Sequence, residues 1–238
     1  MSRVYSDTVL PEDSGVSQDL TLGTTGDTVQ VTSGATLKVN TVKDSGGNTL
    51  FTSDGSGNLS SLNSGFSGGP TLLATNTETD AASSSFTTGI DNTYRVYIFK
   101  FIDINPATDD AQFSFQAGAS SYDTTITSST WRAYNGASGT AFSYLTSGDQ
   151  AQGTGFQQVS YSMGNDADEC LAGQLYLFNP SDTVRVKHFY ARTSVNGYEP
   201  AAIDYYGGGY FNTTTALTQV QFKMASGNFD GIIKMYGM

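Results

Sequence analysis

Tyrosines and carboxylates are concentrated between residues 198 and 211, a segment that also contains three consecutive glycines. Sugar rings stack their apolar faces on aromatic side chains, while carboxylates accept hydrogen bonds from sugar hydroxyls. Glycines at positions 207–209 are typical of a loop that presents such side chains. We therefore expect a glycan-binding site formed by six residues: Tyr198, Glu199, Asp204, Tyr205, Tyr206 and Tyr210.

These tyrosines also have a structural interpretation, in which they pack the interior of a β-sandwich or the axis of an oligomer. A second candidate for sugar binding is Trp131 with Arg132 and Tyr134. This group lies in a stretch that has the pattern of a β-strand. The sequence leaves these alternatives open.

Catalytic groups are sparse. His188 is the only histidine, and it shares one side of an alternating run with two valines, so we expect it to point inward. A Gly-x-Ser-x-Gly match at residues 65–69 lacks the strand and helix that flank a nucleophile elbow. Glu199 with Asp204 as the carboxylate pair of a glycosidase stays an open alternative. We predict a protein without catalytic residues.

Residues 54–58 begin like a calcium-binding loop, because Asp, Ser and Asn alternate with glycine. Leu59 stands where the sharp turn of such a loop requires glycine, and Gly65 stands where its bidentate glutamate binds. A turn between two strands is therefore the favoured interpretation. The acidic cluster at residues 166–169 is interpreted as a solvated loop. We predict no metal site and no cofactor.

The composition argues against several classes of partner. The formal net charge is −11, with 11 Lys and Arg against 22 Asp and Glu. Because no stretch supplies the basic surface that neutralises phosphates, we expect no nucleic-acid binding. No apolar run approaches a bilayer-spanning length, and the first residues lack the apolar core of a secretory signal, so we expect no membrane insertion. Cys170, the single cysteine, fits a reducing cytoplasm as a core thiol.

The elements that position these residues are β-strands, because helical periodicity is almost absent while period-2 alternation recurs. Aromatic residues divide the chain, since only Tyr5 and Phe51 of the 29 (14 Tyr, 14 Phe and one Trp) precede Phe66. We predict four segments: an N-terminal docking arm at residues 1–19, a repetitive β stem at 20–64, a hinge at 65–70 and a head domain at 71–238.

The head contains about nine stretches with strand character, separated by clusters of Gly, Ser, Asn and Asp. Residues 217–224 alternate apolar and polar side chains, which is the pattern of a sheet with one buried face. Residues 94–101 are apolar on both faces, which predicts a central strand. We therefore predict that the head folds as an antiparallel jelly-roll β-sandwich.

The stem contains only short pairs of apolar residues, such as Leu20 with Leu22 and Val29 with Val31. One chain cannot bury a core with so few side chains. Three chains wrapped about one axis would pool these faces, so we predict a homotrimer with a short intertwined β-prism stem. A single-chain β-solenoid is the alternative.

The arm at residues 1–19 is mostly polar. Its apolar side chains are expected to insert into a groove of a partner protein, whereas a disordered terminus is the alternative. The residues expected to dock are Val4, Tyr5, Val9 and Leu10.

Three passages resemble the fibre, spike and decoration proteins of tailed bacteriophages, particularly phages of marine and freshwater bacteria. Residues 33–62, SGATLKVNTVKDSGGNTLFTSDGSGNLSSL, are similar to the strand-turn repeats that precede fibre heads in that group. The polar arm resembles virion-docking peptides. Residues 229–238, FDGIIKMYGM, resemble the closing strand of jelly-roll fibre heads. The resemblance implies a homotrimer mounted on a virion with its head distal, assembled in the host cytoplasm.

We therefore expect a non-enzymatic structural protein of the virion, a trimeric spike or capsid decoration (cement) protein. Its arm would contact capsid or tail proteins, and its head would adhere to host surface polysaccharide. The short stem and single compact head favour a short projection. The alternatives are a receptor-binding tail fibre and a polysaccharide-degrading spike.

Overall fold

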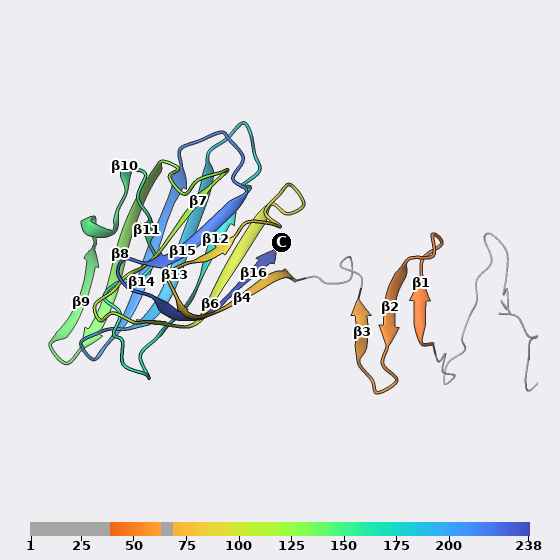
Figure 1. Ribbon diagram of the computed structural model, residues 1–238, viewed down its shortest axis with the longest axis horizontal. Helices are drawn as coiled ribbons and strands as arrows, with labels where there is room; N and C mark the ends of the chain where they lie inside the picture. Colours follow the sequence, from red (N-terminus) through yellow and green to blue (C-terminus); the bar gives the residue numbers. More distant parts are fainter. Residues whose placement is uncertain (1–38, 63–68) are drawn as a thin grey trace, which may run out of the picture. The chain divides into compact units, whose positions relative to one another are not determined.

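The computed structural model describes residues 39–62 and 69–238. The chain divides between Asn63 and Ser64 into two units, and each is described by itself. Strands form both units (Figure 1), all strand pairs among the described residues are antiparallel, and no α-helix occurs in those residues. The predicted all-β, sandwich-like fold is confirmed at this level. The predicted docking residues of the arm lie outside the described residues.

The first unit contains one three-stranded sheet, in the order β1 (Thr41–Lys43), β2 (Thr49–Ser53) and β3 (Leu59–Leu62). Its apolar side chains are incompletely covered within the described chain. Val42 and Leu50 are half-buried, whereas the exposed fractions of Leu59 and Leu62 are 55% and 46%. Most of the apolar pairs on which the stem prediction rests lie outside the described residues.

Two similar connections join the strands of this sheet. Asp44 Oδ1 accepts hydrogen bonds from the backbone N–H groups of Gly46 and Asn48, both at 2.9 Å. Asn48 Nδ2 in turn donates to Asp44 Oδ2 at 3.1 Å. The aspartate thus closes the connection by bonding to its own backbone, as Asx turns do.

The second connection repeats this arrangement ten residues later. Asp54 Oδ1 accepts from the backbone N–H groups of Ser56 at 2.7 Å and Asn58 at 3.1 Å, and Asn58 Nδ2 donates to Asp54 Oδ2 at 2.8 Å. In both connections the asparagine side chain is the main cause that lowers the pKa of the aspartate. Residues 54–58 therefore form the predicted turn, in which the chain's own donors engage the carboxylate.

The second unit contains two sheets. The four-stranded sheet has the order β11 (Gln157–Gln158), β7 (Phe113–Gly118), β15 (Gln219–Met224) and β5 (Ser84–Phe86). The nine-stranded sheet has the order β10, β8, β14, β13, β12, β6, β16, β4, with β9 also paired to β8. Its strands are β4 (Thr71–Ala81), β6 (Val96–Pro106), β8 (Ile126–Gly136), β9 (Gly139–Tyr144), β10 (Ala151–Gly153), β12 (Leu171–Phe178), β13 (Lys187–Asn196), β14 (Ala201–Phe211) and β16 (Phe229–Gly237).

Aromatic side chains fill the space between the two sheets. The Phe222 ring of β15 lies 5.3 Å from both Phe99 and Phe101 of β6, measured between centroids. It also lies 5.8 Å from Phe113 and 6.2 Å from Phe115 of β7. All five rings are at most 2% exposed. Because β6 belongs to the nine-stranded sheet and the other two strands to the four-stranded sheet, these rings form the core of a sandwich.

The predicted loop at residues 204–211 is wrong, because these residues belong to β14, which pairs with β13 on one side and β8 on the other. Gly209 serves the close packing of strands rather than a turn. A Cβ atom on Gly209 would overlap the carbonyl oxygen of Thr127 and lie 2.8 Å from Ser128 Cα. Glycine therefore occupies this strand position because the neighbouring backbone leaves no room.

The inward orientation predicted for His188 is also wrong. His188 is exposed, whereas the neighbouring Lys187 is fully buried and its Nζ donates to the Thr213 carbonyl oxygen at 3.0 Å. Phe189 and Ala191 continue the buried side of β13. The alternation therefore has the opposite phase to that indicated by the two preceding valines, which lie before the strand begins.

Candidate functional site

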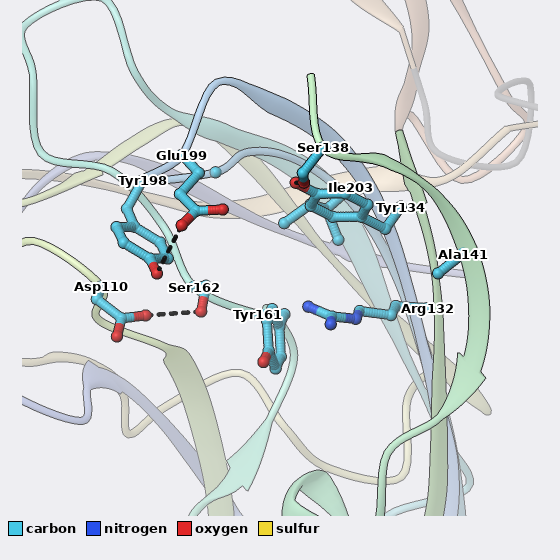
Figure 2. Close-up of a pocket in the computed structure, with 11 residues that line it drawn as sticks. Asp110, Arg132, Tyr134, Ser138, Ala141, Tyr161, Ser162, Tyr198, Glu199 and Ile203 are labelled. Atoms are coloured by element: carbon cyan, nitrogen blue, oxygen red, sulfur yellow. Dashed lines mark hydrogen bonds between the residues drawn. The ribbon is translucent and has the colours of Figure 1, made fainter. Parts of the chain in front are cut away.

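A pocket of about 400 Å³ is lined by Arg132 and Tyr134 of β8 and by residues from distant parts of the chain (Figure 2). Pairing of Arg132 with Tyr205 and of Tyr134 with Ile203 places β8 beside β14. We call this site the Arg132 pocket. Seven of its lining residues carry polar or aromatic side chains used below: Asp110, Arg132, Tyr134, Tyr161, Ser162, Tyr198 and Glu199.

Two single β-bridges assemble the opposite wall from distant parts of the chain. Met163 pairs with both Ala111 and Gly197. The residues next to these three, Asp110, Ser162 and Tyr198, are consequently neighbours, and the Tyr198 backbone N–H donates to the Ser162 carbonyl oxygen at 3.1 Å. The chain therefore fixes this wall by backbone hydrogen bonds rather than leaving it to loop conformation.

The guanidinium of Arg132 is held by aromatic rings. Its Cζ atom lies 3.7 Å from the centroid of the Tyr161 ring and 5.6 Å from that of the Tyr134 ring. Arg132 Nε is buried without a hydrogen-bond partner, and the ion pairs among the described residues do not include Arg132. Cation–π contacts orient the group but leave its N–H donors free, and an unsatisfied buried donor costs about 1–3 kcal/mol.

Two carboxylates face this pocket with acceptor capacity to spare. Ser162 Oγ donates to Asp110 Oδ1 at 2.6 Å, and the Tyr198 hydroxyl donates to Glu199 Oε1 at 3.3 Å (Figure 2). The second oxygen of each carboxylate has no hydrogen-bond partner among the described residues. The nearby charge of Glu199 raises the pKa of Tyr198, so its hydroxyl stays protonated and remains a donor.

Of the six residues predicted to bind sugar, the structure brings only Tyr198 and Glu199 into the Arg132 pocket. Arg132 and Tyr134, from the second predicted candidate, join them there. The sequence therefore indicated parts of two sites that form a single pocket. Asp110 and Tyr161 were missed, because no local pattern connects them with residues that are distant in the chain.

The remaining predicted residues lie elsewhere. Tyr205 is fully buried, its hydroxyl donates to the Gln158 carbonyl oxygen at 3.4 Å, and burial raises its pKa. A ring in this position cannot stack on a sugar, so its assignment to an exposed loop is wrong. Asp204 forms a two-oxygen ion pair with Arg192, in which Arg192 Nη2 lies 2.6 Å from Asp204 Oδ2.

Tyr206 and Tyr210 are half-buried on the face of the nine-stranded sheet opposite to Tyr205. The Tyr206 ring lies 4.5 Å from the ring of Trp131, and Tyr190 lies 4.7 Å from Tyr176, with each pair close to parallel. These distances match the separation of neighbouring strands, about 4.8 Å. The rings therefore stand upright and stack on one another, which leaves edges rather than faces for any ligand.

Among the residues that the structure describes, no group of three or more His, Cys, Asp or Glu could hold a metal ion. Cys170 is half-buried, and burial is the main cause that raises the pKa of its thiol, followed by the charge of Asp103. Within the described residues, no helix is long and apolar enough to cross a membrane.

The fold and the pocket together define an all-β, sandwich-like protein with a polar, tyrosine-lined pocket. In comparisons with known proteins, no family model, no curated protein and no solved structure matches this chain.

Proposed function

We propose that this chain is a structural protein of a bacteriophage virion, a homotrimeric spike or decoration protein without enzymatic activity. The observation that carries the proposal is the incomplete burial of the first unit. Its small sheet leaves Leu59 and Leu62 about half exposed, and a three-stranded sheet with so little apolar cover is marginal alone. Two further copies would supply the missing cover.

We further propose that the head is a jelly roll. In support, the first strand of the second unit, β4, pairs with the last, β16, and the second strand, β5, pairs with the second-last, β15. β6 continues the first sheet between β16 and β12, and β7 continues the second between β15 and β11. A chain folded back in this way and wrapped into two four-stranded sheets is a jelly roll. In this proposal the strands β8, β9, β10, β13 and β14 extend one sheet beyond the basic eight.

The proposed mount is the N-terminal arm, whose apolar residues would insert into a capsid or tail protein. The resemblance to phage fibre and decoration proteins, together with the short stem, favours the capsid. A receptor-binding tail fibre is the second candidate. A polysaccharide-degrading spike is the third, and its favoured carboxylate pair is weakened because Asp204 is occupied by Arg192.

The oligomeric state of the full chain tests the central proposal. Light scattering should give about 75 kDa, three times the 25.2 kDa of one chain. Replacing Leu59 and Leu62 together by Ser should weaken the trimer, whereas Val184→Ser, which alters a more exposed apolar residue of the head, should leave it unchanged. A stable monomer or dimer of the unaltered chain contradicts the proposal.

The mount is tested on particles. A chain lacking residues 1–19 should remain trimeric but fail to sediment with virions. Normal incorporation of this shortened chain into virions would show that the stem or the head, and not the arm, docks on the virion.

A further inference from the structure

The geometry points to the Arg132 pocket as a binding site for a neutral saccharide. This inference deepens the proposed function, on which it rests for the source of the ligand, a glycan of the host surface. It replaces the site predicted from residues 204–210 by one in which Tyr198 and Glu199 act together with residues from other strands.

The first argument is the pattern of donors and acceptors. Arg132 offers N–H donors that no described residue uses, one of them buried. Asp110 and Glu199 each offer a carboxylate oxygen without a partner among the described residues. A sugar hydroxyl both donates and accepts, so a ring with several hydroxyls can satisfy both kinds of group at once. Few other small molecules meet that requirement without carrying a charge.

The second argument is the surrounding surface. The rings of Tyr134, Tyr161 and Tyr198 line the pocket (Figure 2), and Tyr198 is 44% exposed. The apolar face of a sugar ring packs on such side chains, while its hydroxyls reach the polar groups. The volume of about 400 Å³ suits a short saccharide or the end of a longer glycan.

The third argument is charge. One guanidinium and two carboxylates give the pocket a formal charge of about −1, and the whole chain carries −11. The carboxylate of an acidic sugar would pair with Arg132, but it would add a third negative charge beside Asp110 and Glu199, which is unfavourable in a partly desolvated site. A cationic amine would be attracted by these carboxylates but repelled by Arg132, which already occupies the aromatic rings. A neutral ligand avoids both repulsions.

The class of ligand is tested with the full chain on an array of bacterial oligosaccharides that are neutral, uronic-acid-containing or amine-containing. Titration calorimetry on the compounds retained then gives their dissociation constants. We expect neutral saccharides to bind. Exclusive binding of acidic or amine-bearing sugars, or binding of none, would overturn the inference.

The location is tested by matched variants. Arg132→Gln should weaken binding roughly tenfold or more, as expected for lost hydrogen bonds to a charged group. Arg192→Gln, which alters an arginine of the opposite face of the same sheet, should bind like the unaltered chain. Tyr198→Ala and Glu199→Gln, at exposed positions, should also weaken binding while leaving the thermal unfolding midpoint unchanged, so the test does not depend on how well Arg132→Gln folds.

Equal binding by Tyr198→Ala, Glu199→Gln and the unaltered chain would place the sugar elsewhere and refute the site. These results are separable from the proposed function. If the chain is a trimer but binds no neutral saccharide, only the inference about the Arg132 pocket is refuted. If the chain is a monomer that binds a neutral saccharide, the proposed trimer is refuted and the inference about the pocket stands.

Discussion

The indole ring of Trp131 and the phenol ring of Tyr206 stack across β8 and β14, with centroids 4.5 Å apart and planes inclined by 19°. The residues are directly opposite each other in the strand register. Tyr190 on the next strand lies 6.3 Å from Tyr206 with a plane angle of 2°, and Tyr176 continues the row. Such cross-strand pairs stabilise a sheet and fix its register.

The stacked pair should make a measurable pairwise contribution to stability. In a double-mutant cycle with Trp131→Ala and Tyr206→Ala, we expect a coupling energy of about 0.5–1.5 kcal/mol, the range for aromatic pairs beyond their area burial. Urea unfolding of the four proteins measures it. A coupling energy of zero would show that the stacking is not a stabilising contact.

Two tyrosines that are adjacent in the sequence should differ sharply in their roles. Tyr205→Ala removes a fully buried ring and should cost about 3–5 kcal/mol of unfolding free energy. Tyr206→Ala should cost about 1 kcal/mol and leave saccharide binding unchanged, because the ring lies on the opposite face from the Arg132 pocket. A loss of saccharide binding in Tyr206→Ala would contradict this expectation and support the glycan-binding site predicted from the sequence.

The glycines of β14 provide a matched pair for stability. In Gly209→Ala the new methyl group would meet the backbone of Thr127 and Ser128, which cannot move without disturbing β8, so we expect a loss of about 1–3 kcal/mol. In Gly208→Ala the nearest atoms lie 3.7 Å away, an ordinary contact, so this variant should be neutral or slightly more stable. Thermal unfolding of the two variants gives the comparison, and equal midpoints would contradict it.

The aspartate connections of the first unit should respond to acid. Hydrogen bonds from Asn48 and Asn58 hold the pKa values of Asp44 and Asp54 below the usual 3.8. A carboxylate with a lowered folded-state pKa stabilises the folded form above pH 3.8, and this contribution is lost as the pH falls through the lowered value. The backbone amide resonances of Ser56 and Asn58 should therefore shift only below pH 3.8.

Asp54→Asn is the control for this titration. Its amide oxygen can still accept from the two backbone donors but has no proton to gain, so the shifts at residues 56 and 58 should disappear while those at residues 46 and 48 persist. A transition centred above pH 3.8 in the unaltered chain would contradict the assignment.

The sequence predicted the fold well where side chains alternate and poorly where contacts between distant strands decide the structure. Residues 217–224 alternate strictly, and β15 lies there. β14 was missed because glycine has low strand propensity, whereas Gly209 is required by the close approach of the β8 backbone. The predicted strands did not include β4, because Thr71–Ala81 is rich in threonine and carries few apolar residues, as suits an edge strand.

The candidate site was predictable only in fragments. Tyr198 with Glu199 and Arg132 with Tyr134 were recognised by residue type, but their meeting depends on the pairing of β8 with β14, which no local pattern specifies. Asp110 and Tyr161 are brought to the pocket by the β-bridges that Met163 forms with Ala111 and Gly197. The inward orientation predicted for His188 was wrong for a similar reason, because a distant contact decides which side of β13 is buried. The buried Lys187 donates to an acceptor 26 residues away, the carbonyl oxygen of Thr213.

The pairing of β16 with both β4 and β6 has a consequence for biosynthesis. During translation β4 and β6 leave the ribosome early, yet the strand that belongs between them is the last of the sandwich to be made. Until Phe229–Gly237 emerges, β4 has no partner in its sheet and β6 has one free edge. Completion of the sandwich must therefore follow synthesis of residue 237, and a chain arrested before that point would expose sheet edges that invite aggregation.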